Sequence, residues 1–275
     1  MTQNRELGPA AGAVKHDLDT GMPQSARVYD FLLGGKDNYE VDRAVGMALV
    51  EQAPTLPLMV RAQRDLLGRL VRYFVRDVGV RQFLDIGTGL PSANNVHEVA
   101  QAIAPDSRVQ YVDNDPMVLA YARALMKSTA GGRTAFIEAD LRNPDSILGH
   151  RSVTSTLDRN RPVALLLIGI VHHLRDDDRP YDVVGRLVDW LPPGSYVAVV
   201  TPSADFDPAV MASVAATAER AGIPYVPRSK AETEQFLAGL ELVEPGVVPI
   251  LAWRPEREPA DANAVHGWAG VARKP

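Results

Sequence analysis

From residue 80 onward, short apolar segments typical of strands alternate with segments of helical period, and this alternation constrains the fold more than any other feature. Strands that alternate with helices predict a parallel sheet with helices on both faces. The segment 162–170 is almost wholly apolar, as expected of a central strand that is covered on both sides. The sequence therefore predicts an α/β, Rossmann-like fold. Its first five strands are expected at residues 81–86, 109–113, 134–139, 162–170 and 196–201.

Two further strands are expected at the end of the chain, one near residues 240–244 to 251 and one at 267–273. No segment of helix length separates them, which favours a hairpin over a right-handed crossover. We therefore expect a seven-stranded sheet in which the last strand runs antiparallel and inserts beside 196–201. An all-parallel sheet would instead favour a nucleotide-dependent dehydrogenase.

The region before the predicted sheet has a different sequence pattern. Residues 1–22 mix glycine, proline, alanine and charge without any period, and we expect a mobile tail there. Residues 23–79 are predicted to form a helical N-terminal cap, with helices near 25–33 and 58–77. The remaining residues, 80–275, are predicted to form one ligand-binding domain without a clear internal linker.

A glycine-containing turn follows the first predicted strand. Asp85 ends that strand, and Gly87, Thr88 and Gly89 follow it. In an open α/β sheet the ligand lies at the carboxyl ends of the strands, and glycines let backbone N–H groups approach it closely. A dinucleotide site would have a third glycine where this chain has Pro91. The turn alone is compatible with a ligand site or with simple turn geometry.

Acidic residues also end the next two predicted strands. Asp113 lies somewhat over 20 residues beyond the glycines, where an acid in nucleotide-binding sheets accepts hydrogen bonds from ribose hydroxyls. Asp115 precedes Pro116 and is expected to cap the following helix. Asp140 ends the third strand, where it either meets an exocyclic amine or caps a helix. Together with the glycine turn, these acids favour an adenosine-type ligand.

These segments resemble the motifs of the class I S-adenosylmethionine (SAM)-dependent methyltransferases. Residues 85–89 are similar to their first motif, 112–113 to the ribose motif and 139–141 to the adenine motif. Residues 166–174 are similar to the fourth-strand motif of the small-molecule branch. The resemblance implies SAM as the cofactor. It also implies a set of cofactor-binding residues that come from the strand ends: Asp85, Gly87, Thr88, Gly89, Asp113, Asn114, Asp140, Leu141 and Ile168.

A more specific resemblance lies upstream. Residues 27–39 are similar to the signature of an actinobacterial family of S-adenosyl methyltransferases, and so are residues 236–246 and the final Gly-x-Ala/Val-Arg-Lys pattern. The resemblance extends over nearly everything from residue 24 onward. It implies a cofactor and a reaction type, without a substrate.

The segment 29–39 combines aromatic, acidic and amide side chains around a Gly-Gly turn. One interpretation is a helix that stops at glycine, followed by a solvated loop. We favour a lid that packs over the cleft mouth near Gly87 and Asp113, because a displacement reaction needs its sulfonium end closed to water. The lid residues assigned to the cofactor are Tyr29, Gly34, Gly35, Asp37 and Asn38.

Two adjacent histidines, His172 and His173, follow the fourth strand and are the candidate catalytic residues. Either could serve as a general base if the acceptor must lose a proton, and either could instead be a packed or helix-capping histidine. A metal site that includes the aspartates at 176–178 is conceivable, but aspartates before a helix more often cap it, so no metal is predicted. The absence of cysteine excludes thiolate catalysis, disulfides and Cys-based metal sites.

The charge and hydropathy of the chain limit the classes of binding partner that we expect. The net charge of −5 gives no general electrostatic footprint for nucleic acid or for an anionic membrane. The apolar stretch at 163–171 is too short to span a bilayer, and no signal peptide is recognisable, so a cytoplasmic protein is expected.

We expect methyl transfer to a small-molecule acceptor. The alternatives are a non-catalytic SAM-binding or regulatory protein, and an NAD(P)-dependent oxidoreductase, which Pro91 and Asp140 argue against. The oligomeric state is left open.

Overall fold

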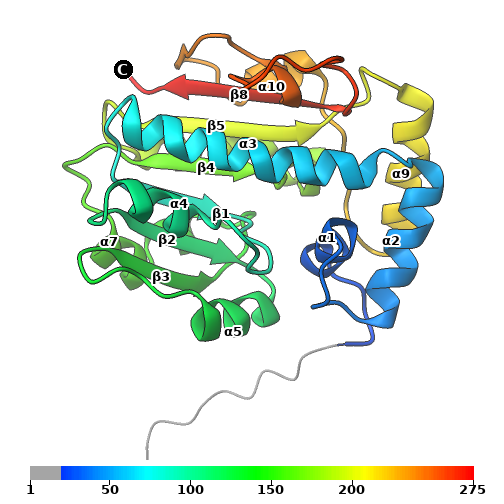
Figure 1. Cartoon of the computed structure of the whole chain (residues 1–275), viewed down its shortest axis with the longest axis horizontal. Helices are drawn as coiled ribbons and strands as arrows, with labels where there is room; N and C mark the ends of the chain where they lie inside the picture. Colours follow the sequence, from blue (N-terminus) through cyan, green and yellow to red (C-terminus); the bar gives the residue numbers. More distant parts are fainter. Residues whose placement is uncertain (1–19) are drawn as a thin grey trace, which may run out of the picture.

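The computed structural model of the chain describes residues 20–275, which form a mixed sheet with helices packed on both faces (Figure 1). Within that range the strand order is β3-β2-β1-β4-β5-β8-β6, and β7 also pairs with β8. All neighbouring pairs from β3 to β5 are parallel, as predicted. The strands are β1 (Gln82–Ile86), β2 (Arg108–Asp113), β3 (Arg133–Glu138), β4 (Ala164–Ile168), β5 (Tyr196–Pro202), β6 (Glu241–Leu242), β7 (Val248–Pro249) and β8 (Gly267–Arg273).

The last strand confirms the expected methyltransferase topology. Strand β8 runs antiparallel to β5, with Gly267 beside Pro202 at one end and Arg273 beside Tyr196 at the other. An antiparallel strand in this position argues against the oxidoreductase alternative, which an all-parallel sheet would have favoured.

The strand expected near residues 240–251 is present as two short strands, so the described residues contain eight strands. Both β6 and β7 pair antiparallel with β8. Pro245 and Gly246 lie between them, and Gly246 adopts a φ of +84°. A residue without an N–H group and a residue in the left-handed region both interrupt a strand ladder, which explains the division.

The helices at the start of the chain lie close to their predicted positions, at Ser25–Leu33 (α1) and Leu56–Arg76 (α3). No pattern in the sequence predicted the helix between them, α2. The helices after α1 are α2 (Glu40–Gln52), α3, α4 (Val96–Ile103), α5 (Pro116–Leu125), α6 (Pro144–Leu148), α7 (Arg151–Thr156), α8 (Pro180–Trp190), α9 (Pro208–Arg220) and α10 (Lys230–Gln235). No helix within residues 20–275 is both long enough and apolar enough to cross a membrane.

Helix α3 forms much of the core on one face of the sheet. Its Phe74 is fully buried and packs against Phe83 of β1, with ring centroids 6.4 Å apart. Tyr73 and Phe74 both contact the ring of Tyr196 on β5. Aromatic side chains bury large apolar areas, so these contacts fix α3 across the central strands. The division of the chain at residues 22 and 79 stays a prediction, and most of the expected tail, residues 1–19, lies outside the described residues.

Helices α1, α2 and α9 gather at the end of the molecule toward which the parallel strands point (Figure 1). Helix α2 packs against both α1 and α9, and α1 also packs against α3. Ligands of open α/β sheets bind at the carboxyl ends of the strands. The N-terminal helices are therefore placed over the region where a ligand is expected.

Candidate active site

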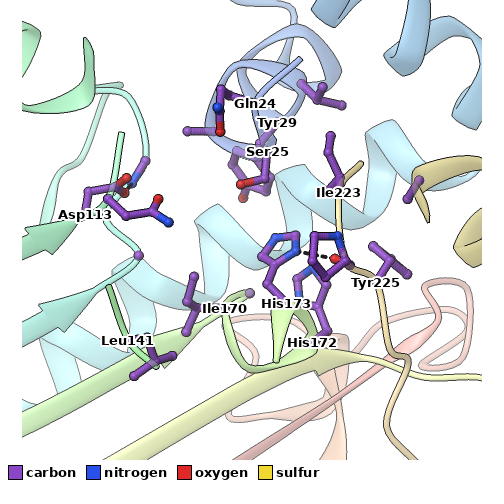
Figure 2. A pocket seen from close by; sticks show the side chains of 18 of the residues that line it. Gln24, Ser25, Tyr29, Asp113, Leu141, Ile170, His172, His173, Ile223 and Tyr225 are labelled. Carbon is purple, nitrogen blue, oxygen red and sulfur yellow. Dashed lines mark hydrogen bonds between the residues drawn. The ribbon is translucent and has the colours of Figure 1, made fainter. Parts of the chain in front are cut away.

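A cavity of about 600 Å³ lies between the carboxyl ends of β1 to β4 and the helices α1, α3 and α9. This volume falls in the range of small-molecule and cofactor sites. Figure 2 shows Asp113 and Leu141 on one side of it, His172 and His173 on the other, and residues of α1 above. The cavity therefore joins the sheet's strand ends to the N-terminal helices in one space.

The glycine turn after β1 lines this cavity. Gly87 and Gly89 both have positive φ angles, +76° and +67°, which favour glycine. A side chain at Gly87 would lie 2.6 Å from Ile170, whereas one at Gly89 would meet nothing within 4 Å. The backbone at Gly89 thus faces open space, as a close approach to a ligand requires.

The acid at the end of β2 is held by the same turn. The Asp113 carboxylate is 7% exposed and accepts hydrogen bonds from the backbone N–H groups of Gly89 (2.9 Å) and Asp115 (3.0 Å). Burial raises the pKa of Asp113 to about 6, against the opposing effect of these donors. A carboxylate has about four lone-pair positions, so Asp113 keeps acceptor capacity toward the cavity.

Two further acids, Asp85 and Asp140, line the cavity. Burial raises the pKa of Asp85 to about 7, while the nearby cation of Arg64 opposes this rise. Asp140 accepts hydrogen bonds from the guanidinium and the backbone N–H of Arg142, which lower its pKa. Part of the acceptor capacity that the sequence assigned to an exocyclic amine is therefore already used by Arg142.

The remaining predicted residues of the strand ends also line the cavity. They are Thr88, Asn114, Leu141 and Ile168. Leu141 is buried and Ile168 is partly buried, so they offer apolar surface beside the acids. The structure thus brings all nine strand-end residues of the predicted cofactor set to one cavity, and it leaves their contact with SAM as a prediction.

The predicted lid residues divide into two groups. Tyr29 lines the cavity, and its hydroxyl donates a hydrogen bond to the Val60 carbonyl (3.1 Å). The structure does not place Gly34, Gly35, Asp37 or Asn38 in the cavity lining.

The side chain of Asp30, near the end of α1, explains why the loop at residues 34–38 does not line the cavity. Its carboxylate accepts hydrogen bonds from the backbone N–H of Asp37 (2.9 Å) and from Asn38 Nδ2 (2.8 Å). These bonds draw the loop back onto α1. The cover over the cavity is therefore α1 itself, through Gln24, Ser25 and their neighbours, and not the loop that follows it.

Buried charges fix the position of α1 over the cavity. Arg27 Nε lies 3.7 Å from carboxylate oxygens of both Asp42 on α2 and Asp115. Asp115 also accepts a hydrogen bond from the N–H of Met117, so it caps α5 as predicted. Since Asp115 follows Asp113 by two residues, Arg27 links the helical cover directly to the end of β2.

His172 and His173 line the side of the cavity opposite Asp113 (Figure 2). Their rings are 4.0 Å apart between centroids, and the His172 ring lies 4.7 Å from that of Tyr225. His173 Nδ1 lies 2.7 Å from the carbonyl oxygen of Pro224. Burial lowers the pKa of both histidines, so both rings are neutral near pH 7.

Among residues 20–275, no three His, Cys, Asp or Glu side chains are grouped so that they could hold a metal ion. The aspartate run that follows the histidines makes other contacts. Asp176 pairs with Arg228 (2.7 Å), and Asp178 accepts a hydrogen bond from the N–H of Arg175 (2.8 Å).

Sequence reasoning missed several residues of the cavity lining. Arg64 and Gln63 come from α3, and Tyr225 comes from the loop after α9. Arg64 looks like one of many arginines on a charged helix face, so no sequence signal separates it. Tyr225 stands between two prolines, and an aromatic residue in such an extended segment was the one available signal.

The chain is similar to several solved structures. A DUF574 family protein from Streptomyces avermitilis MA-4680 shares 45% identity and a TM-score of 0.91, over 94% of this chain and all of that one. A protein from Thermobifida fusca YX shares 41% identity and a TM-score of 0.87, over 94% and 97% of the two chains. The plantazolicin methyltransferase BamL, solved with SAH (S-adenosylhomocysteine), shares the fold at 11% identity and a TM-score of 0.52, over 90% and 95%.

No curated protein matches this chain. The sequence model of a family described as S-adenosyl methyltransferase matches residues 11–275, which is nearly the whole chain. This chain therefore belongs to the S-adenosyl methyltransferase family, and it is a SAM-dependent methyltransferase.

Proposed function

We propose that this enzyme transfers the methyl group of SAM to a small, largely apolar acceptor that binds in the same cavity as the cofactor. The observation that carries the proposal is the continuity of the cavity. It extends from the glycine turn and Asp113 to a region of mainly apolar side chains. These side chains come from α1, α2, α3, α9 and the loop after α9: Val28, Leu32, Leu49, Met59, Val60, Val214, Ala218 and Ile223.

The polar end of the cavity has the chemistry that the cofactor needs. The Asp113 carboxylate offers acceptors for ribose hydroxyls, and the open backbone at Gly89 leaves room for the amino-acid portion. Leu141 and Ile168 offer apolar contacts for an adenine ring. SAM supplies an electrophilic methyl group on a sulfonium when it is bound.

The protein's part in such a reaction is to hold and orient the reactants and to exclude water. Helix α1 covers the cavity, and the buried pairs of Arg27 with Asp42 and Asp115 keep it there. One cavity of about 600 Å³ has to contain both reactants, which favours a small acceptor over a macromolecule. The net charge of −5 supports the further expectation that neither nucleic acid nor an anionic membrane is a partner.

The test uses SAM labelled with tritium in its methyl group and a cell extract of Streptomyces avermitilis, the source of one relative. Enzyme, label and extract are incubated together, and the products are separated by ultrafiltration into small molecules and macromolecules. We expect the label in a new small-molecule product. Label in protein or nucleic acid, or no transfer of label to any small molecule, would contradict the proposed acceptor class.

Ala218→Leu tests whether the acceptor binds in the apolar part of the cavity. Ala218 is buried on α9 and lines the apolar part of the cavity, away from Asp113. The leucine side chain has three more carbons than that of alanine, which reduces the space for the acceptor and leaves the residues around Asp113 unchanged. This variant should bind SAH normally in calorimetry and transfer less label to the small-molecule product.

A further inference from the structure

We propose that the acceptor is a neutral compound with an acidic hydroxyl group, such as a phenol, and that His173 Nε2 accepts the proton of this hydroxyl. The proposal rests on the proposed function and assigns the substrate class of the same cavity.

The hydrogen bond of His173 determines which ring nitrogen is free. Nδ1 lies 2.7 Å from the carbonyl oxygen of Pro224, shown as a dashed line in Figure 2. A carbonyl oxygen can only accept, so Nδ1 carries the hydrogen and donates it. Burial lowers the pKa of His173, which keeps the ring neutral and leaves a lone pair on Nε2. His173 lines the cavity, so this lone pair belongs to a group next to the ligand.

The loop that orients His173 is bonded to the histidine turn at a second point. The backbone N–H of Val226 donates to the carbonyl of His172 at 2.8 Å. Together with the bond to Pro224, this contact holds the loop after α9 against the end of β4. The tautomer of His173 is thus fixed by the fold and does not depend on a bound ligand.

Two further polar atoms beside His173 have no partner. Within residues 20–275, neither the buried hydroxyl of Tyr225 nor Nδ1 of His172 makes a hydrogen bond. Both residues line the cavity, and His172 is only 7% exposed. Buried polar atoms are nearly always paired, and leaving one unpaired is costly. An acceptor with an oxygen at this position could supply a partner to the Tyr225 hydroxyl, which both donates and accepts.

The charges of the cavity distinguish a hydroxyl from an amine. Among the cavity-lining residues that the structure describes, the acids are Asp85, Asp113 and Asp140, all at the strand ends on the cofactor side. The histidine side has mainly apolar neighbours, for example Val214 and Ile223. An ammonium group would lose its hydration there without gaining a counter-charge. A neutral hydroxyl also loses hydration, but the cost is much smaller and one hydrogen bond can offset it.

The step balances with these groups. The hydroxyl oxygen forms a bond to the methyl carbon while the carbon–sulfur bond breaks, and the electron pair of that bond goes to sulfur. The hydroxyl proton goes to His173 Nε2, so the products are a methyl ether, SAH and an imidazolium, which then releases its proton to water. One positive charge is lost at sulfur and one appears on the ring. A weakly basic imidazole is matched to an acidic hydroxyl more closely than to an alkyl alcohol.

The experiment compares three probes that share one ring system: 2-naphthol, 2-methylnaphthalene and 2-(aminomethyl)naphthalene. Each is titrated by fluorescence into the protein saturated with SAH, which occupies the cofactor end. We expect 2-naphthol to bind about tenfold more tightly than 2-methylnaphthalene, as one buried hydrogen bond allows, and the cationic amine to bind most weakly. Equal binding of 2-naphthol and 2-methylnaphthalene, or tightest binding of the amine, would overturn the inference and leave the proposed function standing. If SAH binds and none of the probes does, the proposed small apolar acceptor fails instead.

The variants separate a direct role from a structural one. His173→Leu should reduce the preference for 2-naphthol over 2-methylnaphthalene to about one, and Tyr225→Phe, which removes only a hydroxyl, should reduce it severalfold. His266→Asn is the control, because His266 stacks on Phe206 and lies outside the cavity lining. An unchanged preference in His173→Leu would overturn the inference. Nitrogen-15 NMR offers a readout that does not depend on any probe: we expect the Nδ1–H tautomer at His173, and the Nε2–H tautomer would contradict it.

Discussion

Asp113→Ala tests the cofactor site most sharply, because this carboxylate connects the glycine turn to the cavity. In the structure it accepts hydrogen bonds from the N–H groups of Gly89 and Asp115, and a carboxylate with about four lone-pair positions keeps acceptor capacity for ribose hydroxyls. The substitution should weaken SAH binding without changing the fold.

The magnitude follows from the type of bond. A hydrogen bond to a charged group contributes about 1.5–3 kcal/mol, and about 1.4 kcal/mol corresponds to a factor of ten in affinity. We therefore expect SAH to bind Asp113→Ala about ten- to a hundredfold more weakly. The variant also loses the acceptor of the Gly89 N–H, but that group adjoins the cavity, where water can replace the carboxylate.

Isothermal titration calorimetry with SAH measures the loss, and urea unfolding shows whether the variant is folded. Asp145→Ala is the matched control, because Asp145 pairs with the exposed Arg186 and does not line the cavity. Unchanged SAH affinity in folded Asp113→Ala, or an equal loss in the control, would refute the assignment of Asp113 to the ribose.

Two further predictions concern β1 and its turn. Gly87→Ala should destabilise the protein by about 2 kcal/mol or more, because the residue has a left-handed backbone and its new methyl group would meet Ile170. Gly89→Ala has the same backbone strain without such a contact, so it should destabilise the protein less and should also weaken SAH binding, because its methyl group enters open space; equal effects of the two substitutions in urea unfolding and calorimetry would count against the described turn. Burial raises the pKa of Asp85 from 3.8 to about 7, so the folded chain binds this proton more tightly than the unfolded chain and loses stability as pH rises between those values. Asp85→Asn should therefore be more stable than wild type above pH 7, on the order of 4 kcal/mol, and no more stable below about pH 4; parallel pH profiles of the two proteins would contradict this.

The sheet could be predicted because its signals are local. Each strand from β1 to β5 is a short apolar segment, and the missing helix before β8 already implied an antiparallel end. Helix α2 escaped prediction because its N-cap is Tyr39 and its interior contains Gly46, neither of which marks a helix. In the fold, Gly46 is needed where the ring of Phe31 packs against α2, and this contact could not be read from the sequence.

The part of the site that lies at the strand ends could also be predicted from the sequence, whereas the part formed by loops could not. Asp85, Asp113 and Asp140 reach the cavity because strand ends of a parallel sheet meet at one edge. Tyr225 reaches it only through the long-range packing of its loop against His172, which has no local signal. The loop at residues 34–38 had the composition of a lid, yet one side chain, Asp30, binds it back onto α1.

A crystal structure of the chain with SAH would test most directly whether one cavity holds both cofactor and acceptor. We expect the ribose hydroxyls within hydrogen-bonding distance of Asp113, the adenine beside Leu141, and the sulfur directed across the cavity toward His173, beneath α1. SAH bound elsewhere, or with its sulfur directed away from the region lined by His173 and Tyr225, would contradict the claim that one cavity holds both cofactor and acceptor.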